Sequence, residues 1–392
     1  MDPVANPFRP GAGRRPPLLA GRSQVLDAFA VVQRRAEELG EGDRSWILNG
    51  LRGVGKTVLL TELLDNVSGR GWISAKVEAG ASTSLSVSLS RSLLHGLRTA
   101  TGRHPEPRLR RLLGIFKAFS LKVDPSGNLS LGVDVQPIHG IADSGELSDD
   151  LAALFAALGE TARDLGVGVL VLIDELQEAT ALELAALNTA VHNAGQANVP
   201  LPVVVIGAGL PSLPAQLADA TSYAERLYDY RSIGLLDDDA ARDALTIPSN
   251  ERGVDWDEDG LQAAVQTAGG YPYFIQSIGK HVWDNARRSP ILLDDVEVGL
   301  AEAGREVDDG LYRSRWERAT PVQRDVLRSL AALGGDGAAS VADVARHMGK
   351  GRASDISVAR TELIKKGLTY APERGLLAFT VPGMHDFILR QP

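Results

Sequence analysis

The sequence predicts an α/β protein in which a parallel sheet lies between helices, and three observations carry that prediction. A glycine-rich loop at residues 50–57 lies between a strand-like apolar run and a helical apolar pattern. A nearly unbroken apolar run, residues 167–173, is typical of a strand that is covered on both faces, as in a parallel sheet. From residue 235 onwards the apolar spacing is helical, so we expect the sheet to end before that point.

The glycine-rich loop has the Gly-x-x-x-x-Gly-Lys-Thr spacing of a phosphate-binding loop. Only glycine curls with positive φ at no steric cost, and we expect Gly50, Gly53 and Gly55 to provide that curl. The backbone N–H groups of residues 53–57 would then surround a phosphate at the positive end of a helix dipole. Lys56 would reach the β- and γ-phosphates, and the Thr57 hydroxyl would hold Mg²⁺. The alternative is an ordinary glycine-rich turn that is followed by a lysine.

The neighbouring segments support the phosphate-binding interpretation. Residues 45–49 precede the loop as an apolar run of strand length, and a second strand is predicted at residues 72–77. The residues after the loop have a helical apolar face: Val58, Leu59, Leu60, Leu63 and Leu64. Strand, loop and helix therefore follow one another in the order that a phosphate-binding loop requires.

Two carboxylates, Asp174 and Glu175, end the apolar run. At the carboxyl edge of a strand, Asp174 would hold a water ligand of Mg²⁺, and Glu175 would orient or deprotonate an attacking water. An acidic strand end before a helix is the ordinary alternative, and the presence of the glycine loop favours the functional interpretation. Residues 148–165 before this strand are predicted to be an amphipathic helix with Ser148 as its N-cap.

Composition is typical of a globular protein with more than one domain. The chain has 392 residues, an apolar fraction of 44% and no cysteine, which excludes disulfides and thiolate metal sites. The seven histidines are scattered, and none has the spacing of a metal-ligand set. No apolar run has the length of a membrane span and no apolar signal core begins the chain, so we expect a soluble, cytoplasmic protein with no membrane partner.

The net charge of −9 argues against wholesale coating by nucleic acid, but this charge is unevenly distributed. Residues 321–392 contain ten Lys and Arg against seven Asp and Glu, a net +3, whereas residues 1–320 carry −12. If any segment contacts nucleic acid, the C-terminal segment is the better candidate.

Two segments lie outside the expected sheet. Residues 1–17 are rich in proline, glycine and arginine and are predicted to be an extended arm. The connection after the second strand is too long for one crossover, and residues 117–136 within it have the pattern of a β-hairpin insertion, with a turn at 124–128. Together with the basic run at 103–111, this hairpin is interpreted either as a structural flap or as a contact for DNA or a partner.

The rest of the sheet is predicted from two further strands. A helix at 182–194 leads to a buried strand at 202–209, and a last strand is expected at 227–233. Arg226 and Arg231 lie beside or in that last strand, where either could reach the γ-phosphate of a neighbouring subunit. An ordinary surface arginine is an equally good interpretation of each.

The C-terminal third is predicted to contain two helical groups. Helices are expected at 237–245, 257–268 and 272–286, and proline suits the first turn of the third helix. Residues 319–392 have the pattern of three helices and a hairpin, which are the elements of a winged helix. The polar side chains expected on or beside the outer face of its third helix are Arg352, Ser357, Arg360, Thr361, Lys365 and Lys366.

With these motifs the sequence resembles ATPases of the AAA+ and STAND kind, close to the replication-initiator (origin-recognition) clade and the archaeal-type ATPases. The resemblance covers residues 18–390 and rests on the glycine loop, the strand end at 169–175, Gly270-Tyr271-Pro272 and the terminal three-helix segment. It implies a P-loop NTPase fold with a doubly wound parallel sheet in the order 5-1-4-3-2.

The resemblance divides the chain into a P-loop ATPase core at 18–234, a helical lid at 235–318 and a winged helix at 319–392. It implies ATP and Mg²⁺ as ligands, with Glu175 and Lys56 in catalysis, Thr57 and Asp174 at the metal, and Arg226 or Arg231 as a finger. The residues implied in nucleotide binding are Gly21, Arg22, Gly50, Gly53, Val54, Gly55, Lys56, Thr57, Val58, Gly270, Tyr271 and Pro272.

Within this set, Gly21-Arg22 corresponds to the family's Gly-Arg box, and Gly270-Tyr271-Pro272 corresponds to the lid motif beside adenine and ribose. One position departs from the family. Initiators usually carry an Asn or a similar residue at the end of the fourth strand, and STAND proteins an Arg, whereas this chain has Gly207-Ala208-Gly209.

The leading hypothesis is therefore an ATP-hydrolysing conformational switch that assembles with itself when ATP binds and acts on duplex DNA or a protein client through the winged helix. The alternative is a nucleotide-gated DNA-binding or protein-docking module with little hydrolysis. A small-molecule kinase shares the P-loop but is disfavoured by the Asp-Glu strand end and by a winged helix in place of a substrate lid.

Overall fold

The computed structural model describes residues 1–80, 83–103, 107–123 and 136–391, with the backbone alone for 101–103 and 123. The chain consists of two compact units. The sheet unit contains Ser23–Gly50 and Lys56–Ile233, and the helical unit contains Met1–Arg22, Leu51–Gly55 and Gly234–Pro392. No helix in the described part of the chain is long and apolar enough to cross a membrane.

This division differs from the predicted domains in several places. Residues 18–22, predicted to begin the ATPase core, belong to the helical unit, and so do residues 51–55 in the middle of the glycine loop. The predicted lid and winged helix also group together in that unit. The end of the sheet unit, at Ile233, lies one residue before the boundary expected from the sequence.

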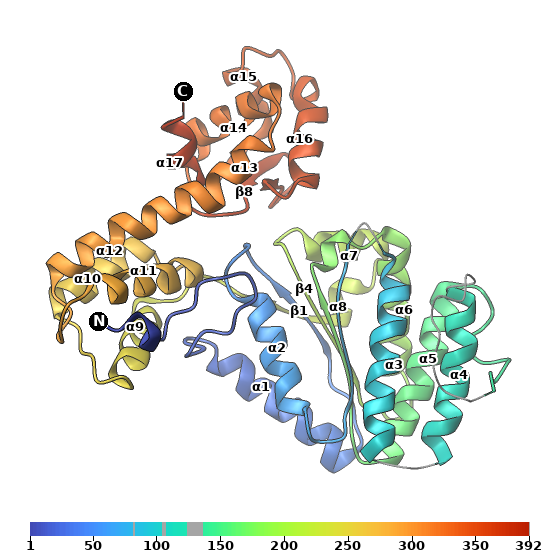
Figure 1. Cartoon of the computed structure of the whole chain (residues 1–392). Coiled ribbons are helices and arrows are strands. Elements are labelled where there is room, and N and C mark those ends of the chain that lie inside the picture. The colour runs from blue at the N-terminus through green and yellow to red at the C-terminus, as the bar shows by residue number, and fades with distance from the viewer. Residues whose placement is uncertain (81–82, 104–106, 124–135, 392) are drawn as a thin grey trace. The chain divides into compact units, whose positions relative to one another are not determined.

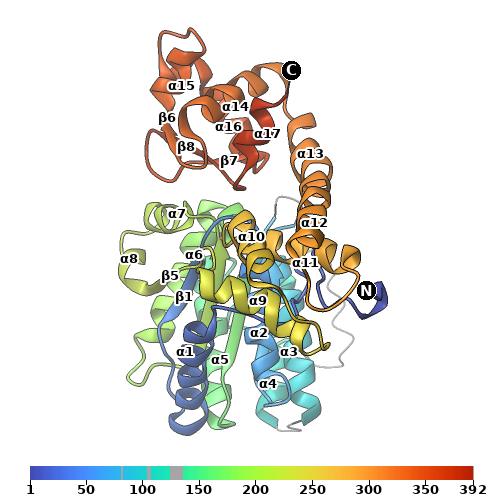
Figure 2. The same cartoon turned by 90° about the vertical axis from the view of Figure 1, so that its left-hand side faces the viewer.

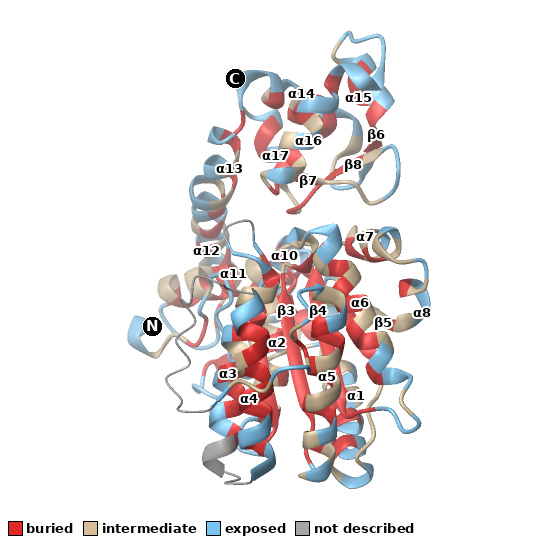
Figure 3. Ribbon diagram, turned by 90° about the vertical axis from the view of Figure 1, so that its right-hand side faces the viewer, coloured by how far each residue is buried: buried red, intermediate tan, exposed pale blue. Residues whose placement is uncertain are grey.

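The centre of the sheet unit is a five-stranded sheet in the order β2-β3-β4-β1-β5, which confirms the predicted order 5-1-4-3-2. All neighbouring strands are parallel, and β3 and β4 are buried along their whole length (Figure 3). The strand bounds are β1 Ser45–Asn49, β2 Ile73–Glu78, β3 Val169–Asp174, β4 Val203–Gly209 and β5 Tyr228–Ser232. Because parallel strands end at a common edge, the residues that follow β1, β3 and β4 come together there.

Helices cover both faces of this sheet, so the unit is doubly wound as predicted. Figure 1 shows α1 and α2 on one face and α3, α5 and α6 on the other, with α4 packed outside α3 and α5. The bounds are α1 Ser23–Arg34, continued by a π-helical turn η2 Arg35–Leu39, then α2 Lys56–Val67, α3 Leu85–Arg103, α4 Pro107–Val123, α5 Leu147–Asp164, the 3-10 turn η3 Leu176–Glu178, α6 Ala181–Gly195, α7 Leu213–Ala220 and α8 Ala224–Leu227.

The β-hairpin predicted at residues 117–136 is wrong where the structure describes it, because Phe119, Leu121 and Val123 lie in α4. The buried side chains of this helix recur at helical spacing: Leu109, Leu112, Leu113, Phe116 and Phe119. Leu121, which should share a face with Phe119 in a strand, is 47% exposed. The predicted turn and second strand, at 124–135, lie outside the described residues.

The helix predicted at 148–165 is present as α5, but its start differs from the expectation. Glu146, not Ser148, precedes the first helical residue, and no side chain caps this end. Asp150 lies in the first turn and is buried, and its carboxylate accepts hydrogen bonds from the backbone N–H groups of Ser144 at 2.7 Å and Gly145 at 2.9 Å. The acidic side chain therefore fixes the preceding loop to the helix.

The helical unit begins with four helices, α9 Asp238–Asn250, α10 Glu258–Ala268, α11 Pro272–Asn285 and α12 Leu293–Glu306. The first three match predicted helices, whereas α12 is not among them. It packs closely on α11, because a Cβ placed on Gly299 would lie 2.6 Å from the Cα of Val282. A π-helical turn, η4 Val307–Tyr312, and α13 Arg313–Glu317 follow α12.

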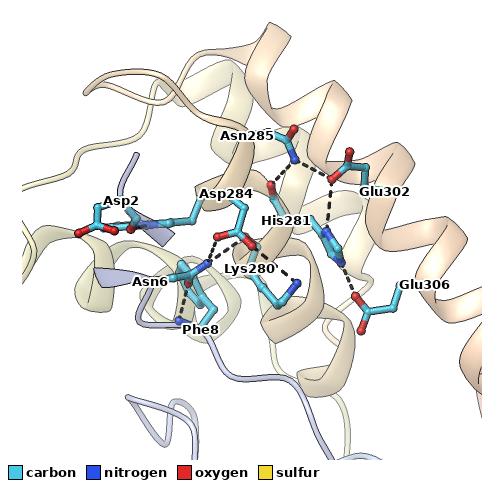
Figure 4. Close-up of polar contacts among 10 residues, drawn as sticks. Asp2, Asn6, Phe8, Lys280, His281, Asp284, Asn285, Glu302 and Glu306 are labelled. Atoms are coloured by element: carbon cyan, nitrogen blue, oxygen red, sulfur yellow. Dashed lines mark hydrogen bonds and ion pairs between the residues drawn. The ribbon is translucent and has the colours of Figure 1, made fainter. Parts of the chain in front are cut away.

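The N-terminal segment, predicted as an extended arm, packs on α11. It contains one 3-10 turn, η1 Pro3–Ala5, and its Phe8 is buried in the core of α9–α12. The side-chain amide of Asn6 donates to the Lys280 carbonyl at 3.0 Å and to Asp284 Oδ1 at 2.8 Å, as Figure 4 shows. The same view shows His281 between the carboxylates of Glu302 and Glu306. The first residues of the chain are thus part of this helical group.

The C-terminal segment contains the predicted helices and hairpin together with one further strand, β6, and one further helix, α17. Its elements are α14 Pro321–Gly334, β6 Ala338–Ser340, α15 Val341–His347, the 3-10 turn η5 Ala353–Ile356, α16 Ser357–Lys365, β7 Thr369–Tyr370, β8 Leu376–Phe379 and α17 Met384–Leu389. The strands form an antiparallel sheet in the order β6-β8-β7 (Figure 2). Ile356, Ala359 and Leu363 are buried, as the sequence predicts. The identification of this segment as a winged helix stays a prediction.

Candidate functional site

The carboxyl edge of the sheet brings together the two carboxylates and the start of the glycine loop. In the sheet register Ile47 and Ile173 both pair with Gly207, so β1 and β3 end on either side of β4. Thr57, in the first turn of α2, donates from Oγ1 to Asp174 Oδ2 at 2.6 Å. The contact joins the predicted loop threonine to the predicted strand-end carboxylate.

Asp174 is fixed from two sides. It is only 5% exposed, and its second oxygen, Oδ1, accepts the backbone N–H of Glu175 at 3.0 Å. A buried carboxylate that is hydrogen-bonded at both oxygens has a fixed orientation. The Thr57 hydroxyl and this carboxylate are oxygen donors of the kind that Mg²⁺ prefers, so the residues present fit that ion.

Lys56 is buried and directed toward the start of the same loop. Its ammonium group donates to the Gly50 carbonyl at 2.9 Å, and the lysine is 6% exposed. Gly50 in turn donates its N–H to the Gly209 carbonyl at 3.1 Å, which ties the loop to the end of β4. A buried ammonium at a helix N-terminus forms a strongly positive place, which fits an anionic ligand such as a phosphate group.

Glu175 has an unusual backbone conformation. Its φ is +49°, in the left-handed region that a side chain such as glutamate rarely adopts, so the conformation is strained by an amount on the order of 1 kcal/mol. Its side chain is half-buried, and Oε2 accepts a hydrogen bond from Gln177 Nε2 at 2.6 Å. Strain of this kind persists only where the surrounding structure fixes the residue, and it is common at functional sites.

The glycines of the loop behave as predicted at two of three positions. Gly53 and Gly55 have φ values of +80° and +95°, which supply the expected curl. Gly50 is not among the residues with positive φ, so its predicted part in the curl is wrong. The backbone of Gly50 instead makes two hydrogen bonds: its carbonyl accepts the Lys56 ammonium, and its N–H donates to the Gly209 carbonyl.

Within the helical unit, residues 51–55 contact the other predicted nucleotide-binding residues. Arg22 donates from Nη2 to the Val54 carbonyl at 3.1 Å and to the Gly234 carbonyl at 2.7 Å. Burial lowers the pKa of Arg22 from its ordinary value, and Asp237 opposes this shift. The Tyr271 hydroxyl donates to the Arg52 carbonyl. These contacts join the predicted Gly-Arg box and lid motif to the middle of the glycine loop.

Gly21, Gly270 and Pro272 have local reasons for their identity. Gly21 and Gly270 have φ values of +66° and +69°. A Cβ on Gly270 would lie 2.1 Å from the Leu236 carbonyl oxygen. Pro272 is the first residue of α11, where its missing N–H is not needed. Val58, the remaining predicted residue, is half-buried in the first turn of α2.

The two candidate finger arginines differ in their surroundings. Arg231, in β5, lies 3.7 Å from the centre of the Trp46 ring and 2.7 Å from Asp229 Oδ2, and its side chain is 24% exposed. These contacts give Arg231 a structural role in the sheet unit. Arg226, in the short helix α8, is exposed. Of the two, Arg226 keeps the accessibility that a finger needs.

The predicted outer face of the C-terminal segment is only partly free. Arg352, Ser357 and Thr361 are exposed and Arg360 is half-buried, whereas the Lys366 ammonium donates to Gln323 Oε1 at 2.7 Å. Val358 is 78% exposed beside them.

One residue at the site was missed by sequence reasoning. Gln177 lies two positions after Glu175 in η3 and contacts both that glutamate and the backbone that follows β4. The only signal in the sequence is its position two residues after the Asp-Glu pair.

Comparisons with known proteins bear on the family and the fold of the chain. Residues 18–206 match the family described as AAA ATPase domain, and residues 309–388 match a domain of unknown function (DUF8462). A comparison with curated proteins finds no match.

Two solved proteins have the same fold over nearly the whole chain. The Walker-type ATPase PABY2304 of Pyrococcus abyssi is 17% identical with a TM-score of 0.58, over 98% of this chain and 99% of that one. The Aeropyrum pernix ORC2 protein, in its ADPNP-ADP complexes, is 14% identical with a TM-score of 0.54, over 96% and 94%. At these identities the likeness shows the fold alone. Residues 18–206 are therefore similar in sequence to an AAA ATPase domain, and the chain has an α/β fold of the P-loop NTPase kind, as the resemblance of the sequence predicted.

Proposed function

We propose that this chain binds ATP together with Mg²⁺ and hydrolyses it, with Glu175 as the base that activates water. The observation that carries the proposal is the 2.6 Å contact between Thr57 Oγ1 and Asp174 Oδ2, directly beside Glu175. It supports a shared metal position between the loop and the strand end, with the base next in sequence. That ORC2 was solved in ADPNP-ADP complexes supports an adenine nucleotide as the ligand.

Each residue has a separate part in this mechanism. The curled backbone around Gly53 and Gly55 presents N–H groups to the phosphates, and the Lys56 ammonium balances their charge. Thr57 and Asp174 would hold Mg²⁺, which neutralises charge on the phosphate oxygens when bound. Glu175 orients a water molecule and accepts its proton.

Two substitutions test binding and hydrolysis separately. Lys56→Ala removes a charge-assisted contact, and we expect ATP affinity in titration calorimetry to fall at least about tenfold. Glu175→Gln keeps the shape but not the base, and we expect kcat to fall by about 10²–10⁴ with ATP affinity retained. Glu178→Gln, exposed in the same turn, is the matched control and should keep the parent rate.

Either of two results would contradict the proposal. ATP affinity that survives Lys56→Ala would exclude the loop as the phosphate site. A Glu175→Gln protein with the parent rate would exclude the glutamate as the base, and loss of activity in the Glu178→Gln control would show that any change in this turn is harmful.

We further propose that the bound nucleotide works as a conformational switch. Residues 51–55 belong to the helical unit and are held there by Arg22 and Tyr271, whereas Lys56 belongs to the sheet unit. A change at residues 51–55 therefore acts on the contacts of Arg22 and Tyr271, and ATP and ADP can favour different populations of these contacts. Hydrogen exchange with ATP or ADP bound to the Glu175→Gln protein should differ in α9–α12, and identical exchange would argue against the switch.

Self-assembly and the finger are tested together. We propose that ATP promotes oligomers in which Arg226 reaches the neighbouring γ-phosphate. Mass measurement should then show a larger species only with ATP, and Arg226→Ala should lower kcat in that species alone. A monomer at every nucleotide state would remove the finger.

The C-terminal segment is the proposed contact for DNA or a protein client. Arg352 and Arg360 supply its cationic surface, whereas Lys366 is engaged internally and Val358 is an exposed apolar neighbour. We expect salt-dependent binding of duplex DNA that is lost on Arg352→Ala and Arg360→Ala if DNA is the partner. No binding at low salt would leave a protein client, for which Val358 is the natural contact.

A further inference from the structure

The end of β4 is built around a side chain that comes from another element. Related ATPases carry a polar side chain at the end of this strand, where this chain has Gly207 and Gly209. These two glycines leave room for the 3-10 turn η3 that follows Glu175. A Cβ on Gly207 would lie 2.5 Å from Leu176 Cδ2, and one on Gly209 would lie 2.6 Å from Gln177 Oε1. Contacts this short do not occur, so a side chain at either position would have to displace the side chain of Leu176 or Gln177.

Gln177 uses both ends of its amide in this space. Nε2 donates to Glu175 Oε2 at 2.6 Å, and Oε1 accepts the backbone N–H of Leu210 at 3.1 Å. The orientation of the Gln177 amide suits its surroundings, because its nitrogen faces carboxylates and its oxygen faces an N–H group. Glu178 Oε1, 3.5 Å from Nε2, is the only other carboxylate that the described contacts place on this amide.

The same contacts continue to the phosphate-binding loop. Gly209 precedes Leu210 in the chain, and its carbonyl accepts the N–H of Gly50 at 3.1 Å. The Gly50 carbonyl accepts the Lys56 ammonium at 2.9 Å. A series of hydrogen bonds and one peptide bond thus joins the loop lysine to the carboxylate of Glu175, and every member lies in the sheet unit.

We propose that Gln177 is a positioning residue for Glu175: its amide fixes the carboxylate in the orientation that faces the reacting water and ties it to the end of β4. The role deepens the proposed ATPase function and rests on it. It also accounts for a strand end without a polar side chain, because Gln177 supplies the polar group from η3. The contact is made to a residue whose backbone is strained, with φ of +49°.

The test compares Gln177→Ala with Gln177→Glu in the full chain. Gln177→Ala removes both hydrogen bonds, and we expect kcat to fall about tenfold while KM for ATP stays within about twofold. Gln177→Glu keeps an acceptor for Leu210 N–H but loses the donor to Glu175. The introduced carboxylate would repel that of Glu175, so we expect kcat to fall at least as far as in Gln177→Ala, again with KM for ATP within about twofold.

Matched measurements separate this role from a structural one. Fluorescent ATP analogue affinity and melting temperature should stay near the parent values in both variants, and Gln196→Ala, an exposed glutamine after α6, should change nothing. If Gln177 only supported the fold, Gln177→Glu would behave as the parent and Gln177→Ala would lose affinity and melting temperature together.

The failures of the two proposals are distinguishable. Unchanged kcat in Gln177→Ala, beside an inactive Glu175→Gln protein, would overturn the positioning role and leave the ATPase intact. A rise in kcat would also overturn it, because Gln177 would then restrain the glutamate. Full activity in Glu175→Gln would instead overturn the proposed function itself.

Discussion

The contact between Phe8 and Gly279 permits a double-mutant cycle that tests whether the N-terminal segment is part of the helical group. Phe8 is 3% exposed, and a Cβ on Gly279 would lie 2.6 Å from Phe8 Cδ1 and 2.7 Å from Cγ. The glycine lies inside α11, where it has no turn to make. Its identity is therefore explained by the aromatic ring against it.

The expected energies follow from this geometry. Phe8→Ala should lower the free energy of unfolding by about 3 kcal/mol, because it empties a buried aromatic site. Gly279→Ala in the parent should lower the free energy of unfolding by about 2 kcal/mol, because the new methyl group displaces the ring. The better helix propensity of alanine offsets about 1 kcal/mol of this loss. In the Phe8→Ala protein the displacement cost disappears and the same substitution should stabilise by about 1 kcal/mol. The coupling between the two sites is then about 2 kcal/mol.

Urea unfolding followed by circular dichroism gives the free energy of unfolding of the parent, the two single variants and the double variant. Hydrogen exchange reports the local stability of α11 in each of them. The control is Gly304→Ala in α12, where a Cβ would meet nothing within 4 Å. It should stabilise by about 1 kcal/mol in both backgrounds. Equal effects of Gly279→Ala with and without Phe8, within about 0.5 kcal/mol, would refute the packing of Phe8 on α11.

Three further predictions concern the candidate site. Gly53→Ala should weaken ATP binding more than about tenfold in calorimetry, because Gly53 has a φ of +80° and a Cβ there would lie 2.0 Å from the Tyr271 hydroxyl oxygen. Adding Tyr271→Phe should not restore ATP binding, since the backbone strain at residue 53 remains. Arg231→Ala should lower the free energy of unfolding by about 1 kcal/mol through loss of the contact with Trp46. A lower kcat at an unchanged free energy of unfolding would instead indicate that Arg231 is an arginine finger. Arg22→Ala, which breaks two bonds to backbone carbonyls, should weaken ATP binding about tenfold, and parent affinity would exclude its predicted role.

The parts of the fold that sequence could predict are those with strong local patterns. The strands before Gly50 and Asp174 are continuous apolar runs bounded by glycines or carboxylates, and such runs specify buried parallel strands. The candidate site residues Lys56 and Thr57 were predicted from the spacing of the glycine loop together with the strand before it and the helix after it. The strand order came from the family resemblance, since no local pattern specifies which strands are neighbours.

The wrong predictions have equally local causes. Phe119, Leu121 and Val123 alternate over too few residues to separate a strand from a helix, and the longer pattern that starts at Leu109 decides for α4. The packing of Phe8 could not be read from a segment rich in proline and glycine, because one buried aromatic ring leaves no periodicity. Long-range contacts such as that of Phe8 with Gly279 become visible only in three dimensions.

The end of β4 shows why an absent residue type can mislead. Read along the chain, Gly207-Ala208-Gly209 lacks the polar side chain that relatives place there, which suggests a weakened hydrolytic site. In the structure the side chains of Leu176 and Gln177 occupy the space that a side chain on either glycine would need, and Gln177 brings an amide to Glu175 at 2.6 Å. A missing side chain on one strand and an extra one on a neighbouring turn are thus a single packing arrangement. Placing a side chain at Gly209 alone should therefore impair the site, because the new side chain would displace Gln177 without taking over its hydrogen bond to Glu175.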